Sequence, residues 1–112
     1  MKYAFVFALL AGPVFADAPV VEAVQIDGAR VSVTLSHADT GWDDYADGWE
    51  VLDADGNRLG FRELLHPHVN EQPFTRSLGD VQIPEGAKSI FIRARDNVGG
   101  WSEDLFEVTL PQ

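Results

Sequence analysis

The sequence predicts an all-β protein, an antiparallel β-sandwich of about seven strands. Apolar and polar residues alternate with a period of two in short runs, which is typical of strands that bury one face. Glycine, proline or aspartate interrupts these runs about every ten residues, as expected where the chain reverses. About seven such runs fit into the 112-residue chain, and this spacing is typical of a sandwich.

The first 16 residues predict a secretory signal peptide that precedes the strands. Lys2 is followed by an apolar run at residues 3–15, which is too short to span a bilayer, and then by small residues. The small residues allow cleavage after Ala16 or after Ala18, and we take the first site because the second leaves a proline at the new N-terminus. The sequence therefore predicts one domain at residues 17–112, periplasmic or secreted, with no membrane span in the mature chain.

The first two strands are expected in "VVEAVQIDG" and "RVSVTLSHA". The first run ends in an Asp-Gly turn, and the second alternates without interruption. Val31, Val33 and Leu35 of the second run share one face, so we expect all three in the core.

The next two strands are expected to form a hairpin in "GWEVLDADGNRLGFRELL". Trp49 and Val51 lie on the entering strand, and Leu59 and Phe61 lie on the returning strand. The Asp-Gly pair at residues 55–56 predicts the turn between them. We expect the four apolar residues to point into the core.

Three further runs complete the predicted sandwich. "FTRSLGDVQIP" ends at Pro84, which would interrupt a strand ladder. "KSIFIRARD" and "LFEVTLP" alternate again. The residues expected in the core are Ile90, Ile92 and Ala94 in the second of these runs and Phe106, Val108 and Leu110 in the third.

The same alternation turns Arg93 and Arg95 outward, and Arg62 or Arg76 could join them across the sheet. Such a stripe could bind the carboxylates of a partner, or it could pair with this chain's own Glu50 and Glu107. We favour the second interpretation, because opposite charges on neighbouring strands are common in sheets.

Charge and sulfur content exclude several functions. The chain has 18 acidic and 8 basic residues, a formal charge of −10 that becomes −11 when Lys2 leaves with the signal peptide. This field repels phosphates, so we expect no nucleic-acid partner. The chain has no cysteine, so it contains neither a disulfide nor the cysteine that carries the lipid of a lipoprotein. Met1 also leaves with the signal peptide, which excludes a sulfur-ligated copper(I) site.

Two segments resemble known β-sandwich modules. "GWEVLDADGNRLG" and "IRARDNVGGWS" look like the central hairpin and the last strand pair of fibronectin type III and related immunoglobulin-like modules. Lys88 stands where such modules usually place a tyrosine. The whole mature chain also resembles a group of small exported proteins of Gram-negative bacteria that carry a similar histidine-proline-histidine segment. These resemblances imply a fold and a compartment, and they imply no activity.

The predicted strand order places three long loops at one end of the sandwich, because successive connections alternate between its two ends. These loops, residues 37–48, 66–74 and 96–104, carry all three histidines and two of the three tryptophans. We call this end the loop pole. Loops on a rigid scaffold commonly carry function, although long loops are also polar simply because they face water. The candidate contacts are Trp42, Tyr45 and Trp101 as apolar area and Asp43, Asp44, His66, His68 and Glu71 as polar anchors.

His66 and His68 also suggest a metal site. Residues two apart on an extended segment point to the same face, so both imidazoles could bind zinc or copper(II). Glu71 or His37 would supply further ligands. Two histidines at the end of a strand can equally bond to nearby backbone groups, so the spacing does not decide the matter.

The sequence therefore predicts an exported, non-enzymatic binding or accessory module that contacts an unknown protein, peptide or glycan through the loop pole. No cofactor is certain. Binding of zinc or copper(II) is the alternative. A small hydrolase is a less favoured one, because a domain of this size seldom forms a substrate cleft.

Overall fold

A computed structural model describes residues 18–112. The predicted signal peptide, residues 1–16, lies outside this range, and each of the two cleavage signals includes residues outside it. The described chain contains no helix able to cross a membrane. Its eight strands are β1 (Val20–Asp27), β2 (Arg30–Ser36), β3 (Ala46–Leu52), β4 (Arg58–Glu63), β5 (Phe74–Leu78), β6 (Ser89–Asp96), β7 (Gly100–Trp101) and β8 (Phe106–Thr109).

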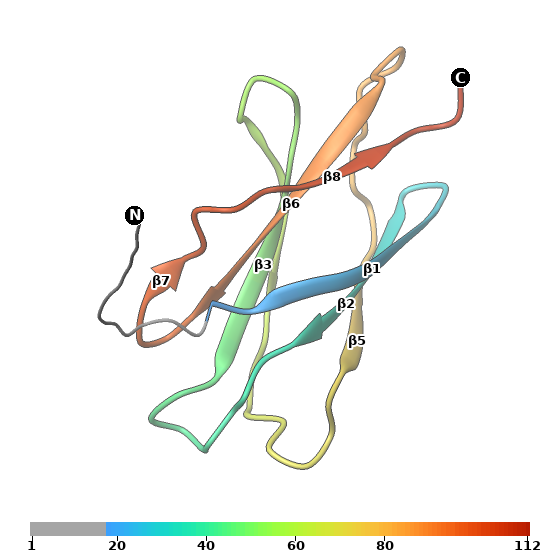
Figure 1. Ribbon diagram of the computed structural model, residues 1–112. Helices are drawn as coiled ribbons and strands as arrows, with labels where there is room; N and C mark the ends of the chain where they lie inside the picture. Colours follow the sequence, from blue (N-terminus) through green and yellow to red (C-terminus); the bar gives the residue numbers. More distant parts are fainter. Residues whose placement is uncertain (1–17) are drawn as a thin grey trace, which may run out of the picture.

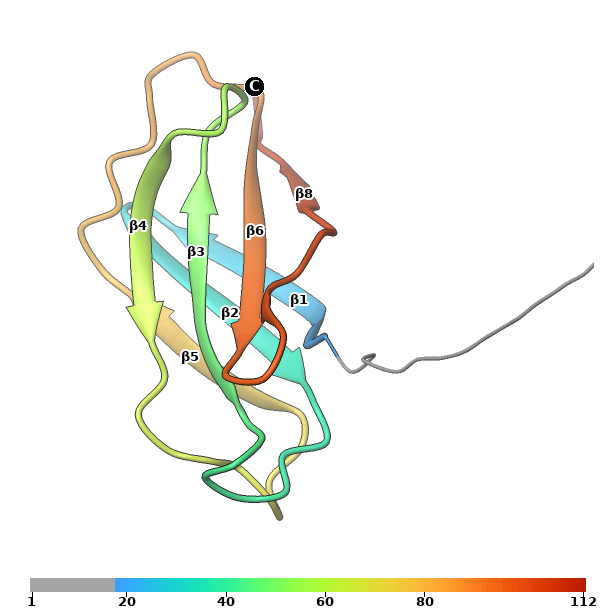
Figure 2. The ribbon, with the colours of Figure 1, turned by 90° about the vertical axis from the view of Figure 1, so that its left-hand side faces the viewer.

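The strands form two antiparallel sheets that face each other (Figures 1 and 2). One sheet has the order β1-β2-β5, and the other has the order β4-β3-β6-β7, with β8 also paired to β6. The predicted all-β, antiparallel two-sheet architecture is thus confirmed, with eight strands in the described range rather than about seven.

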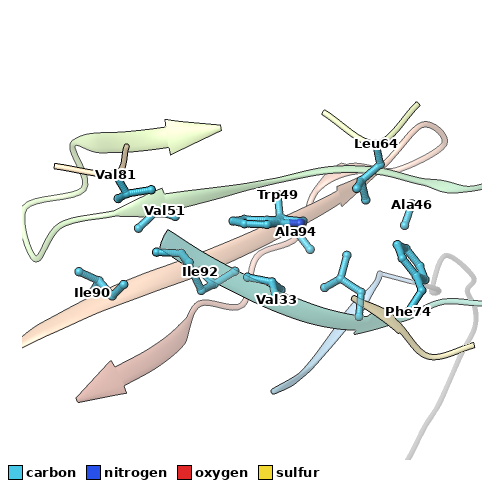
Figure 3. Close-up of a cluster of buried hydrophobic side chains, with 12 residues drawn as sticks. Val33, Ala46, Trp49, Val51, Leu64, Phe74, Val81, Ile90, Ile92 and Ala94 are labelled. Atoms are coloured by element: carbon cyan, nitrogen blue, oxygen red, sulfur yellow. The ribbon is translucent and has the colours of Figure 1, made fainter. Parts of the chain in front are cut away.

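The core lies between the sheets and is built by the predicted alternation. Val31, Val33 and Leu35 of β2 are all at most 1% exposed, and they face a row from β6 that is similarly buried. Trp49 of β3 lies at 0% exposure in the middle of the cluster that Figure 3 shows. The β6 residues of this cluster are Ile90, Ile92 and Ala94, as expected.

The prediction of a core position is wrong for two residues, Phe61 and Phe106. Phe61 is 37% exposed, and it is the cross-strand partner of Glu50, so its ring lies on the outer face of the five-stranded sheet. Phe106 is the first residue of β8 and lies opposite buried Ile92, but it is 38% exposed, because β8 pairs only with β6 in the described chain and leaves that edge uncovered. Leu59, Val108 and Leu110 do pack against the core, though only partly buried.

The run predicted as a strand up to Pro84 ends earlier. β5 stops at Leu78, and Asp80 adopts a positive φ of 59°, which breaks the extended backbone. Val81 is nevertheless 2% exposed, because its N–H donates to the carbonyl of Ala29 and holds the segment against the core.

The additional strand, β7, follows a tight reversal after β6. The Asp96 carboxylate accepts the N–H groups of Val98 and Gly99, and Gly100 has a φ of 79°, which favours glycine. The chain therefore pairs Trp101 with Arg95, leaves the sheet, and rejoins it as β8.

The arginines are distributed differently from the expectation. Arg93 and Arg95 point outward as predicted, but Arg62 pairs across the strands with buried Trp49 and so lies on the opposite face. Arg76 is on β5, in the other sheet. Arg58, which the sequence did not single out, joins the outward pair instead.

The connections sort by end as predicted. The turns at residues 28–29, 53–57 and 79–88 lie at one end, and the loops at residues 37–45 and 64–73 and the β6–β7 turn lie at the other (Figures 1 and 2). In the middle turn, the N–H of Asn57 donates to the Asp53 carboxylate and lowers its pKa below the ordinary value.

Candidate functional site

Asp39 is the centre of the loop pole. Its carboxylate, whose side chain is 0% exposed, accepts hydrogen bonds from Nδ1 of His37 (2.6 Å), from the N–H of Ala46 (3.0 Å) and from the N–H of His68 (2.7 Å). These donors come from the first loop, from the start of β3 and from the second loop. A single buried carboxylate therefore joins two loops of the pole to the sheet.

Gln72 and Asn97 make further side-chain hydrogen bonds between the loops of the pole. Gln72 accepts the N–H of His37 through Oε1 and donates through Nε2 to the carbonyl of His68. Asn97 accepts the N–H of Tyr45, donates its own N–H to the Tyr45 carbonyl, and donates through Nδ2 to the carbonyl of Trp42. The three loops thus meet at one end of the molecule, as the alternation of connections predicts.

Trp42 lies at the tip of the first loop. Gly41 and Asp44 form an isolated bridge, and Gly41 has a φ of 147°, so the chain reverses sharply around Trp42 and Asp43. Trp42 is 65% exposed, and its ring and that of Tyr45 form a T-shaped pair with a centroid distance of 5.6 Å. The result is an exposed tryptophan packed on a half-buried tyrosine, on a backbone that Asn97 holds in place.

The second loop brings His66 and His68 together but gives them different surroundings. Their ring centroids are 4.6 Å apart, and His66 is exposed whereas His68 is 5% exposed and stacks on Phe74 at 3.8 Å. Nε2 of His68 accepts a hydrogen bond from the Arg76 guanidinium at 2.8 Å. Burial first, then the charges of Arg76 and His66, lower the pKa of His68 below 6.5. His68 is therefore a neutral, structural side chain near pH 7.

His37 faces a different set of groups. Its side chain is 1% exposed, and Nε2 lies 3.6 Å from Oδ2 of Asp96 and 3.8 Å from Oδ1 of Asp44. Within residues 18–112 this nitrogen has no hydrogen-bond partner, and no group of three or more histidine, aspartate or glutamate side chains is arranged to hold a metal ion. The structure thus does not assemble the four expected ligands His37, His66, His68 and Glu71 into one set.

Trp101 does not join the other two candidate aromatics. Its ring lies 6.0 Å from that of Phe61 on the outer face of the five-stranded sheet, and three arginine side chains approach it there. The expected apolar area of Trp42, Tyr45 and Trp101 is therefore divided between two surfaces. Trp42 and Tyr45 remain on the pole.

The loops of the pole carry other exposed apolar side chains besides Trp42. Eight large hydrophobic side chains are exposed in the described chain, and four of them lie in the three loops of the pole: Trp42, Leu65, Val69 and Val98. Asp43 and Glu71 are exposed beside them in sequence, and the side chain of Asp44 is 31% exposed. The pole therefore presents apolar side chains together with carboxylates.

Asp39, Gln72 and Asn97 were not among the expected site residues, although they determine its shape. Each lies within three residues of the end or beginning of a strand and carries side-chain oxygen that can accept from backbone. That position is the signal in the sequence. It does not reveal which loop will supply the partner.

Comparison with known proteins adds one relative. A protein of the halophilic archaeon Halomicrobium mukohataei, described as "Putative lipoprotein", is 49% identical over 70 residues, which cover 62% of this chain and 34% of that protein. The chain thus spans about a third of the length of this relative. No family model and no solved structure matches the chain, so the resemblances to fibronectin type III modules and to Gram-negative proteins stay predictions.

Proposed function

We propose that this protein is an exported, non-enzymatic accessory protein that binds a partner through the loop pole. The name of the archaeal relative and the signal-peptide pattern at residues 1–16 support export to the cell envelope, periplasmic or secreted. The order of the two sheets, β1-β2-β5 and β4-β3-β6, agrees with a fibronectin type III-like scaffold that presents its loops at one end.

The observation that carries the proposal is the exposed Trp42, packed on half-buried Tyr45 on a fixed backbone. An exposed tryptophan loses little conformational entropy on binding when its loop is already ordered, as the three hydrogen bonds of Asn97 order this one. Aromatic residues at the centre of an interface commonly dominate its affinity. The buried acids and histidines of the pole hold the loops together, which supports a binding role over a catalytic one.

The partner expected from this surface offers an apolar area together with hydrogen-bond donors, because the pole combines Leu65, Val69 and Val98 with exposed carboxylates. A protein, a peptide or a glycan could supply both.

The test compares two exposed aromatics in binding to material from the host cell envelope. Immobilised wild-type protein, Trp42→Ala and Phe106→Ala are incubated with envelope extract and with a glycan array. We expect a component that the wild type and Phe106→Ala retain and Trp42→Ala loses. Equal retention by all three proteins would refute a binding role for the pole.

Binding of zinc or copper(II) remains the alternative proposal, supported by the 4.6 Å approach of the His66 and His68 rings. Arg76 opposes it, since its guanidinium lies at Nε2 of His68. Calorimetric titration with either ion decides: heat that disappears in His66→Ala supports the site, and absence of heat removes it. A hydrolase activity is the remaining alternative, and the contacts among the described residues of the pole do not favour it.

A further inference from the structure

The outer face of the five-stranded sheet carries a cluster of cations around one tryptophan. The guanidinium carbons of Arg58, Arg93 and Arg95 lie 5.8, 5.0 and 5.2 Å from the centroid of the Trp101 ring. We call these residues, together with Phe61, the arginine face. Three of the eight basic residues of the chain thus gather on one surface of an acidic protein.

Two carboxylates of the same sheet hold the guanidiniums in place. Nε of Arg58 donates to Oε1 of Glu50 at 2.9 Å, and Nε of Arg93 donates to Oε2 at 2.7 Å. Nε of Arg95 donates to Asp47 at 3.0 Å. The three guanidiniums and the two carboxylates that hold them sum to +1 in a chain of −10. Glu63 and Glu107 lie on the same outer face, at the cross-strand positions of Gly48 and Phe91.

Two of the three arginines keep exposed side chains. The hydrogen bonds of Arg58 and Arg95 to these carboxylates run through Nε, and the two side chains are 51% and 33% exposed. A guanidinium held through Nε still offers the N–H groups of both terminal nitrogens in a planar fork, which matches a carboxylate. The cations are therefore preorganised, because their rotamers are already fixed.

We propose that the arginine face binds an acidic segment of a partner polypeptide, in which carboxylates flank an apolar side chain. The carboxylates meet the free edges of Arg58 and Arg95, and the apolar side chain meets Phe61, which is 37% exposed. The negative charge of the whole chain repels extended polyanions at long range, so the contact depends on short-range pairing with a few carboxylates.

An acidic polysaccharide would carry the same carboxylate chemistry, but the tryptophan favours a polypeptide. A sugar ring stacks on an open aromatic face, and guanidiniums already lie over the ring of Trp101. What remains accessible is the set of guanidinium edges and the Phe61 ring. Arginine and aromatic residues are also enriched among the side chains that dominate protein–protein interfaces.

The experiment titrates isotope-labelled protein with a five-residue peptide that has phenylalanine at its centre and two glutamates on either side. We expect the indole N–H signal of Trp101 to shift while that of Trp42, on the pole, stays in place. The double variant Arg58→Gln/Arg95→Gln should bind at least about five-fold more weakly. Arg30→Gln/Lys88→Gln, which removes the same charge from exposed positions off the face, should bind within about two-fold of the wild type.

Further arms of the titration separate carboxylate pairing from a general attraction between charges. A twin peptide with glutamine in place of glutamate should not shift the signal, and Arg58→Lys/Arg95→Lys, which keeps the charges and the fold, should bind more tightly than the glutamine variant. Equal loss in both charge-removing variants would overturn the proposal, because only overall charge would then matter. A stronger response to oligogalacturonate, or a shift that depends on protein concentration alone, would also overturn it in favour of a polysaccharide or a second copy of the chain.

Discussion

Two of the buried carboxylates in the described chain, Asp39 and Glu50, are stabilised in different ways. Asp39 at the loop pole accepts from two backbone N–H groups and one imidazole, whereas Glu50 on the sheet accepts from two guanidiniums. Their side chains are 0% and 3% exposed, so burial does not distinguish them. The two carboxylates differ instead in which groups donate hydrogen bonds to them.

The donors of Asp39 belong mostly to loop segments, so this carboxylate determines how the loops are ordered. The donors of Glu50 are side chains on strands that backbone hydrogen bonds already hold together, and Glu50 determines only where two arginines point. The first carboxylate thus shapes the pole. The second orients the arginine face on a sheet that forms without it.

Among the substitutions that test this difference, Asp39→Asn should have the largest effect on stability. The amide keeps one acceptor oxygen and turns an NH₂ group toward backbone donors, so at least one buried N–H loses its partner. We expect the free energy of unfolding to fall by about 2–4 kcal/mol, measured in urea. The exposed neighbour Asp43→Asn should cost less than about 0.5 kcal/mol. Equal stability of the two variants would show that Asp39 does not hold the pole.

Glu50→Gln should have the next largest effect. It removes the charge from a buried site, but Arg58 and Arg93 are 51% and 35% exposed and can turn into water. We therefore expect a loss of about 1–2 kcal/mol in the same urea experiment. Glu107→Gln, on the same sheet, is the control and should cost less than about 0.5 kcal/mol. If amide signals of residues 37–45 changed in Glu50→Gln, the two regions would not be independent.

Asn97→Ala tests how far the side chain of Asn97 orders the backbone around Trp42 and Tyr45. The substitution removes the side-chain bonds to Tyr45 and Trp42 but leaves the backbone bond, and the site is exposed, so water replaces the lost partners. We expect a cost of about 1 kcal/mol, together with faster hydrogen exchange at the Tyr45 amide. Unchanged exchange at Tyr45 would mean that the turn around Trp42 is ordered by its own bridge alone.

The smallest expected effect is a pH dependence that arises at His68. Because burial and Arg76 lower its pKa in the folded protein, the unfolded chain takes up the proton first. His68 therefore contributes stability that is complete above its ordinary pKa of 6.5 and is lost as the pH falls from there through the lowered value. Urea midpoints at several pH values should show this decline in the wild type and in His66→Asn, and a weaker one in His68→Phe. An identical slope in all three proteins would assign it to other groups.

The sequence predicted the strands well, because alternation is a property of the local backbone. Val31, Val33 and Leu35 had to share a face once the segment was extended, and their burial was confirmed. The same rule failed for Phe61, because a register irregularity between Val51 and Leu52 sets Phe61 opposite Glu50 on the outer face. Phe106 lies opposite buried Ile92 but stays 38% exposed, because alternation does not show which edge of a sheet remains uncovered.

The position of the loop pole also followed from the sequence, because it depends only on the order and direction of the strands. The grouping of its side chains did not. Trp101 was expected with Trp42, and the short pairing of β7 with β6 placed it beside Phe61 instead.

What the sequence alone determined is therefore the class of fold, the buried rows and the end of the molecule at which the long loops meet. The tertiary structure decided which polar groups are buried and what they bind. The hydrogen bond between Asp39 and His68 joins residues 29 apart, and that between Tyr45 and Asn97 joins residues 52 apart. Such contacts depend on how two sheets and three loops come together in space, which no local periodicity encodes.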